Sequence, residues 1–119
     1  MKVGDYVRTK RGLIARILKI NSTGSITCDR NIYWGAGDYN SKKTLCDLTQ
    51  IIKSSPDIID LIQEGDYVNG DCISRVEVDS IDGIKRAYNC EYYTACYENK
   101  DIKTIATKEQ FESMEYEVK

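Results

Sequence analysis

The sequence predicts an all-β protein with little helix, made of two similar halves. Residues 3–7 (Val-Gly-Asp-Tyr-Val) return 61 positions later as residues 64–68 (Glu-Gly-Asp-Tyr-Val). Gly-Asp favours a tight turn, because glycine tolerates positive φ and aspartate hydrogen-bonds nearby backbone, while Tyr-Val favours a strand. Short β-branched segments separated by turn residues fill the rest of both halves. We therefore expect an N-terminal domain over 1–54, a linker helix over 55–62 and a C-terminal domain over 63–119.

Four strands are expected in the first half. They run over 6–9, 13–20, 25–34 and 45–53. Gly12 and the Asn-Ser-Thr-Gly sequence after the second strand mark tight turns, and the Gly-rich segment before the fourth strand is the longest expected loop. Apolar residues lie on both faces of 13–20, which is typical of a strand that curves around a small barrel.

The segment 55–62 predicts a short helix. Ser55 is a suitable N-cap, Pro56 fits the first helical position, and Asp57 favours the electropositive first turn. Four of its last five residues are apolar. We expect this wide apolar stripe to pack between the two halves.

The second half repeats the plan. Its expected strands begin at residues 67, 72, 84, 93, 102 and 114. Asp82-Gly83 predicts a type I′ hairpin turn, in which both central residues need positive φ. Gly83 matches Gly24 at a shift of 59 positions, and Arg75-Val76 matches Arg16-Ile17 at the same shift. The repeat is therefore expected to span at least two strands and the turn between them.

Short curved strands opened by Gly-Asp-x-Val, with one helical turn before the last strand, resemble an SH3-like barrel of the KOW or Tudor kind. Residues 3–17 carry this resemblance, and residues 64–76 carry it more loosely. KOW motifs usually have a second glycine near the position of Ala15. The resemblance implies two tandem SH3-like barrels. Because the second glycine is absent here, the ribosomal and transcription-factor functions of KOW proteins are not carried over to this chain.

A second resemblance concerns the origin of the chain. Residues 51–70 and 107–118 are similar to the middle segment and the ending of a group of small proteins from phages and prophages of Gram-positive bacteria. Small accessory phage proteins include antagonists of host defence, such as anti-CRISPR proteins. The resemblance implies an origin in a mobile element and no particular chemistry. Our favoured hypothesis is a viral inhibitor that acts in the host cytoplasm by binding a host protein, for which a CRISPR effector is the candidate.

The composition argues against several classes of function. The chain has no histidine, so it lacks the commonest general base. Its five cysteines show no close pair of the kind that holds zinc. No apolar stretch approaches the ~18 residues of a membrane span. We expect no enzyme activity, no metal, no cofactor and no membrane association, and a cytoplasmic location.

Charge divides the chain into a basic and an acidic half. Residues 1–62 have ten Lys or Arg and six Asp or Glu, whereas residues 63–119 have seven and thirteen. The basic half suits an anionic partner and the acidic half a basic one, although the same polarity also suits docking of the halves on each other. The sequence decides neither which half is functional nor the oligomeric state.

Three sets of residues are candidates for binding. The basic set is Arg8, Lys10 and Arg11; the aromatic loop set is Trp34, Tyr39, Lys42 and Lys43; the acidic set is Glu98, Asp101 and Glu112. The first two sets suit phosphates and stacked bases, which makes an RNA- or DNA-binding module the alternative function. The loop set also suits a protein interface.

The acidic set suits a surface that mimics nucleic-acid charge and occupies the basic groove of a nuclease. Simpler interpretations stand beside each of the three hypotheses. They are a solvated basic face, a tryptophan that belongs to the core, and acids that keep the protein soluble and protect a strand edge.

Overall fold

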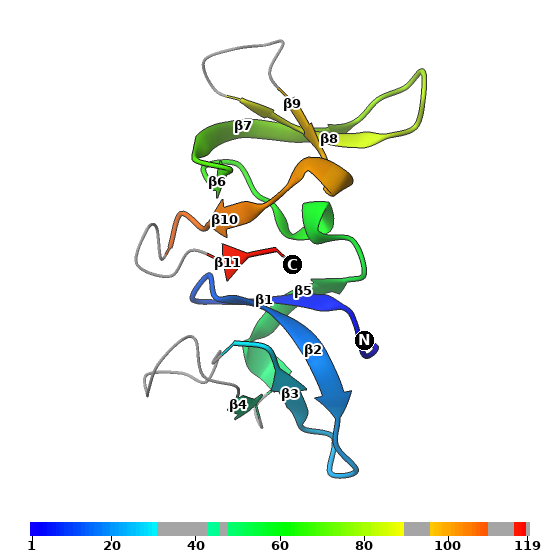
Figure 1. Cartoon of the computed structure of the whole chain (residues 1–119), viewed down its shortest axis with the longest axis vertical. Helices are drawn as coiled ribbons and strands as arrows, with labels where there is room; N and C mark the ends of the chain where they lie inside the picture. The colour runs from blue at the N-terminus through cyan, green and yellow to red at the C-terminus, as the bar shows by residue number, and fades with distance from the viewer. Residues whose placement is uncertain (31–42, 46–47, 90–95, 110–115, 119) are drawn as a thin grey trace. The chain divides into compact units, whose positions relative to one another are not determined.

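The computed structural model describes residues 1–30, 43–45, 48–89, 96–109 and 116–118, which form two compact units, 1–57 and 58–119 (Figure 1). The protein is mostly β, with two antiparallel sheets, as the sequence predicts. In the part of the chain that the structure describes, the helical elements are single 3-10 turns.

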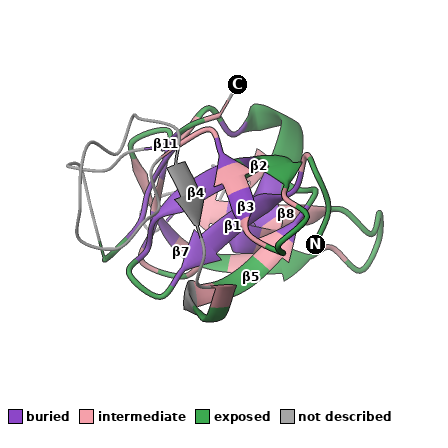
Figure 2. Cartoon of the chain, turned by 90° about the horizontal axis from the view of Figure 1, so that it is seen from below, coloured by how far each residue is buried: buried purple, intermediate pink, exposed green. Residues whose placement is uncertain are grey.

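The first unit is a five-stranded sheet. Its elements are β1 (Tyr6–Thr9), β2 (Ile14–Ile20), β3 (Ile26–Cys28), β4 (Lys43–Leu45), η1 (Leu48–Gln50) and β5 (Ile51–Ser55). The strand order is β4-β3-β2-β1-β5, so β1 lies in the interior of the sheet between β2 and β5. Val7, Ile14, Ile17 and Ile26 are almost completely buried, and Figure 2 colours such positions purple.

The second unit repeats this order and adds a strand. Its elements are η2 (Ile58–Leu61), β6 (Tyr67–Val68), β7 (Asp71–Val78), β8 (Lys85–Asn89), β9 (Cys96–Glu98), η3 (Asn99–Asp101), β10 (Thr104–Ala106) and β11 (Tyr116–Glu117). The order is β11-β10-β6-β7-β8-β9, in which β11 covers the outer edge of β10. Val68, Ile73 and Ile105 are buried in its core.

The two Gly-Asp turns have the same geometry. Gly4 and Gly65 have φ values of 95° and 93°, which favour glycine strongly over any residue with a Cβ. The Oδ2 atom of Asp5 accepts the N–H of Lys2 at 3.0 Å, and Oδ2 of Asp66 accepts the N–H of Gln63 at 2.7 Å. The expected chemistry of this turn is therefore present in both copies.

The next backbone bonds set the register of the repeat. Gly4 N–H donates to Ile17 O and Ile17 N–H donates to Asp5 O, both at 2.8 Å; Gly65, Ile73 and Asp66 make the same two bonds, also at 2.8 Å. Ile17 thus corresponds to Ile73, 56 positions later. The expected match of Ile17 with Val76, at a shift of 59, is wrong.

A β-bulge follows each of these isoleucines, and the shift of 56 holds to the ends of the equivalent pairing, Ile20 and Val76; it changes again in the next strands, β3 and β8. Ile17 pairs with Cys28 in β3, and Ile73 pairs with Asn89 in β8. Cys28 and Asn89 are 61 positions apart. The first hairpin of the second unit is therefore five residues shorter than its counterpart, and the second hairpin is five residues longer.

The segment 55–62, expected to form one linker helix, is divided between the two units. Ser55 is the last residue of β5, and its Oγ accepts the N–H of Asp57 at 3.1 Å, as a capping side chain would. Helical structure begins only at Ile58, in the second unit. The N–H of Ile59 donates to Oδ1 of Asn99 at 3.0 Å, so η2 is fixed within its own unit.

Candidate protein-binding hairpin

The five additional residues of the second unit lie at the end of the β7–β8 hairpin. Ile20 pairs with Ile26 in the first unit, and Val76 pairs with Ala87 at the equivalent place in the second. A turn of five residues, 21–25, joins the first pair, whereas ten residues, 77–86, join the second. We call residues 77–86 the arm; it extends from β7 and β8 in Figure 1.

Hydrogen bonds donated by backbone N–H groups to two aspartate side chains hold the end of the arm. Oδ1 of Asp79 accepts the N–H of Ile81 at 2.7 Å, and Oδ1 of Asp82 accepts the N–H of Ile84 at 2.9 Å. Gly83 N–H donates to Asp79 O at 2.9 Å and has a φ of 72°. Because Asp82 does not share this positive φ, the turn is not the type I′ turn that the sequence predicts, but a wider one.

Arg86 lies among three carboxylates at the base of the arm. Its guanidinium is 2.7 Å from Oδ2 of Asp82, 3.4 Å from Oδ2 of Asp79 and 3.7 Å from Oε2 of Glu98. The hydrogen bond from Arg86 lowers the pKa of the Asp82 carboxyl, and the bond to Asp82 raises the pKa of the guanidinium. This Arg86 cluster connects the turn of the arm, through Asp79 and Asp82, to Arg86 at its base and to Glu98 of β9, and restrains the turn.

The arm presents apolar side chains to solvent. Ile81 is 94% exposed, Val78 62% and Ile84 38%. A restrained turn that carries an exposed isoleucine suits insertion into an apolar pocket of another protein, because little further ordering is needed on binding.

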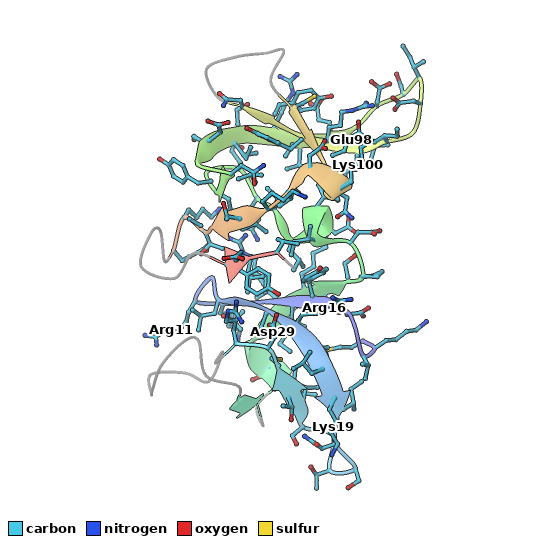
Figure 3. The ribbon with its side chains drawn as sticks, in the orientation of Figure 1. Arg11, Arg16, Lys19, Asp29, Glu98 and Lys100 are labelled. Carbon is cyan, nitrogen blue, oxygen red and sulfur yellow. The ribbon has the colours of Figure 1, made fainter. Side chains whose placement is uncertain are left out.

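The acidic candidates are partly engaged in local structure. Oδ2 of Asp101 accepts the N–H of Glu98 at 3.1 Å, and the two residues form a capping box around η3. Glu98 also approaches Arg86, and Figure 3 labels it beside Lys100. Glu112 lies outside the described residues.

The basic candidates do not share one exposed face. Arg8 is completely buried and the other residues of β1 are buried as well, because this strand lies in the interior of the sheet. Lys10 and Arg11 are exposed in the turn after β1, and Figure 3 shows Arg11 pointing away from the ribbon. The expectation that Arg8 forms one basic binding set with Lys10 and Arg11 is therefore corrected, because Arg8 is not at the surface.

Of the aromatic loop set, Trp34, Tyr39 and Lys42 lie outside the described residues. For Lys43 the structure describes only its place in β4, where it pairs with Cys28.

Sequence reasoning missed two residues of the arm, Ile81 and Arg86. The signal for Arg86 is its spacing of four residues from Asp82 across a glycine turn, which places opposite charges close together. The signal for Ile81 is an isoleucine between Ser80 and Asp82, where the turn itself needs only polar residues.

Comparisons with family models, curated proteins and solved structures find no match to this chain. Among the described residues, none of the helical segments has the length and apolar character needed to cross a bilayer. The same residues contain no group of three or more Cys, Asp or Glu side chains placed to hold a metal ion.

Proposed function

We propose that this chain is a non-catalytic protein-binding protein that inserts the arm of its second unit into a partner. The observation that carries the proposal is Ile81, 94% exposed at the end of an arm that the Arg86 cluster restrains. The first unit closes the equivalent hairpin with only five residues, so the sheet itself does not require this apolar extension.

We also propose that each unit is an SH3-like barrel. Both units have the strand order of that fold, with a 3-10 turn directly before the strand that pairs with the first one. These are η1 before β5 and η3 before β10. Small barrels of this kind present their hairpin ends and strand edges to partners, which fits a binding role.

Electrostatics favour a basic partner for the arm. Residues 58–119 have seven Lys or Arg and fourteen Asp or Glu, a net charge of −7. Long-range attraction from such a unit accelerates association with a positively charged surface, and salt weakens the effect. A host nuclease with a basic nucleic-acid groove has this property. Together with the resemblance to phage proteins, this makes an antagonist of host defence, such as an inhibitor of a CRISPR effector, the specific function we propose.

Affinity purification with matched variants tests the proposal. The tagged chain is incubated at low salt with a lysate of a Gram-positive host that expresses a CRISPR effector, and retained proteins are identified by mass spectrometry. Burial of an isoleucine stabilises a complex by about 1.5–3 kcal/mol, so we expect Ile81→Asp to weaken retention by ~10–100-fold. Leu18→Asp, at a 41% exposed position of the first unit, is the control and should retain the same protein. Equal retention by Ile81→Asp and wild type, or no specific protein with either, would count against an arm-mediated inhibitor.

A nucleic-acid-binding role for the first unit is the second candidate. Lys10 and Arg11 are both exposed in one turn of a unit that has ten Lys or Arg and five Asp or Glu. A gel shift with single-stranded RNA or DNA at low salt should then be lost in the double variant Lys10→Glu, Arg11→Glu. If the wild type gives no shift, this candidate is removed and the arm is unaffected.

A further inference from the structure

The two units differ at one strand edge. In the second unit β10 pairs with β6 on one side and with β11 on the other. In the first unit β5, the counterpart of β10, pairs with β1 and is the last described strand of its sheet. In an antiparallel ladder every second residue of an edge strand directs its N–H and C=O away from the sheet, where another strand can bind them.

The repeat gives the register of such an added strand. Ser54 lies opposite Val7 as Ile105 lies opposite Val68, so β5 and β10 correspond at a shift of 51 positions. In the second unit Tyr116 lies opposite Ile105 and Glu117 lies opposite Thr104. The N–H of Val118 also donates to the carbonyl of Lys103 at 2.6 Å.

Transferred to the first unit, this register places a tyrosine-like residue opposite Ser54 and an acidic residue opposite Lys53. Ile52, the next residue of β5, lies where the pairing of β5 with β1 shifts register, so the transferred register is used for Lys53 and Ser54 alone. Ile52 is 49% exposed and Lys53 is also exposed, so both are accessible at this edge. Opposite charges facing each other across neighbouring strands stabilise the pair.

Charge also distinguishes a foreign strand from a second copy of β5. Antiparallel self-pairing centred on the five residues of β5 would place Lys53 opposite the same lysine of the other copy. Like charges directly opposite destabilise strand pairing. The first unit as a whole has a net charge of +5 from ten Lys or Arg and five Asp or Glu. Both features favour an acidic partner.

We propose that the β5 edge of the first unit is a second protein-binding site, which takes an extended acidic segment of a partner protein as an added antiparallel strand. The segment alternates acidic and apolar residues, as the sequence Met-Glu-Tyr-Glu-Val of residues 114–118 does. This site does not rest on the arm, so the chain would contact partners through two separate surfaces.

Two peptides and one charge reversal test the proposal. The acidic probe has the sequence of residues 112–118 of this chain, Glu-Ser-Met-Glu-Tyr-Glu-Val, with blocked ends. The control has lysine in place of each glutamate. Each is titrated to millimolar concentration into the ¹⁵N-labelled full chain at low salt, and amide shifts and exchange rates are followed.

The acidic peptide should shift and protect the amides of 51–55, and the control peptide should bind more weakly. Lys53→Glu should weaken the acidic peptide by about 2–5-fold and strengthen the lysine peptide by a similar factor. Ile81→Asp should change the affinity for neither peptide, so the experiment can refute the β5-edge proposal without refuting the arm proposal. The proposal is overturned if no amide of 51–55 responds at millimolar acidic peptide, if the response is confined to the second unit, or if Lys53→Glu leaves the preference unchanged.

Discussion

Asp66 tests most directly how the duplicated turn is held. Its side chain is completely buried; Oδ2 accepts the N–H of Gln63 at 2.7 Å and Oδ1 accepts the N–H of Lys108 at 3.0 Å. Asp5, its counterpart, is 8% exposed and accepts the N–H of Lys2 at 3.0 Å. Substitution by alanine therefore leaves two N–H donors without this acceptor at Asp66 and one at Asp5.

The expected cost follows from the donors that lose an acceptor. A buried N–H without a partner costs ~1–3 kcal/mol, and partial exposure of the donors places each near the lower end. Asp66→Ala leaves two such donors and should lower the free energy of unfolding by about 2–3 kcal/mol. Asp5→Ala leaves one donor close to an exposed chain end and should cost about 1 kcal/mol.

Urea unfolding measures both costs. Far-UV circular dichroism follows the whole chain, and fluorescence of Trp34, the single tryptophan, follows the unit that contains it in sequence. Asp57→Ala, which removes an exposed carboxylate, is the control and should stay within ~0.5 kcal/mol of the wild type. Equal losses for Asp66→Ala and Asp5→Ala, or a loss under ~1 kcal/mol for Asp66→Ala, would refute this account of the turn.

Three further predictions concern single residues. Burial, with a smaller effect of Asp29, raises the pKa of the Cys28 thiol to about 12. Iodoacetamide at pH 8 should therefore modify exposed Cys96 much faster than buried Cys28. Peptide mass spectrometry measures both rates, and equal rates would contradict this prediction. The lowered pKa of Asp82 stabilises the folded arm at neutral pH, and this contribution should be lost as the pH falls through that pKa, below the ordinary value of 3.8. A loss of protection of the Ile81 and Ile84 amides in acid, measured against intrinsic exchange at the same pH, would report this, and Asp82→Asn should lower their protection at neutral pH as well. Gly65→Ala places a Cβ at a φ of 93° and should destabilise the chain by ~1–2 kcal/mol in urea unfolding, as should Gly4→Ala in the other copy, whereas a neutral effect of either would contradict the positive-φ turn.

Local chemistry made the turns and most strands predictable. The Gly-Asp turns depend on the φ of one glycine and one side-chain acceptor, both of which can be inferred from residue type. The strand β2 (Ile14–Ile20) is rich in β-branched residues and lies within the expected range 13–20. The sequence also indicated two copies, because the Gly-Asp turn and the Tyr-Val that follows it are the same in both halves.

Features set by distant pairing could not be predicted in the same way. Arg8 and Lys10 are two positions apart, which places them on the same face of an extended strand. This spacing does not tell whether the strand is central in its sheet. β1 is buried because β2 and β5 flank it. The match of Arg75-Val76 with Arg16-Ile17 is a local similarity, whereas the register depends on the bonds of Ile17 and Ile73 to the two Gly-Asp turns. The candidate site was missed for a related reason, since Arg86 acquires its role only when the hairpin brings Asp79 and Glu98 to it.

The opposite length changes of the two hairpins explain how the second unit carries an arm without losing its sheet. The first hairpin of the second unit is five residues shorter and the second hairpin is five residues longer. The strand pairing between these changes is equivalent to that of the first unit, including the bulge, the pair Ile73–Asn89 and the pair Val76–Ala87. The additional residues therefore lie beyond the last common pair, where they bury no core side chain. A flexible extension there would lose conformational entropy on binding, but Asp79, Asp82 and Glu98 fix it through Arg86 before a partner arrives. Substituting Arg86 by methionine should consequently weaken binding while leaving the β7–β8 pairing intact.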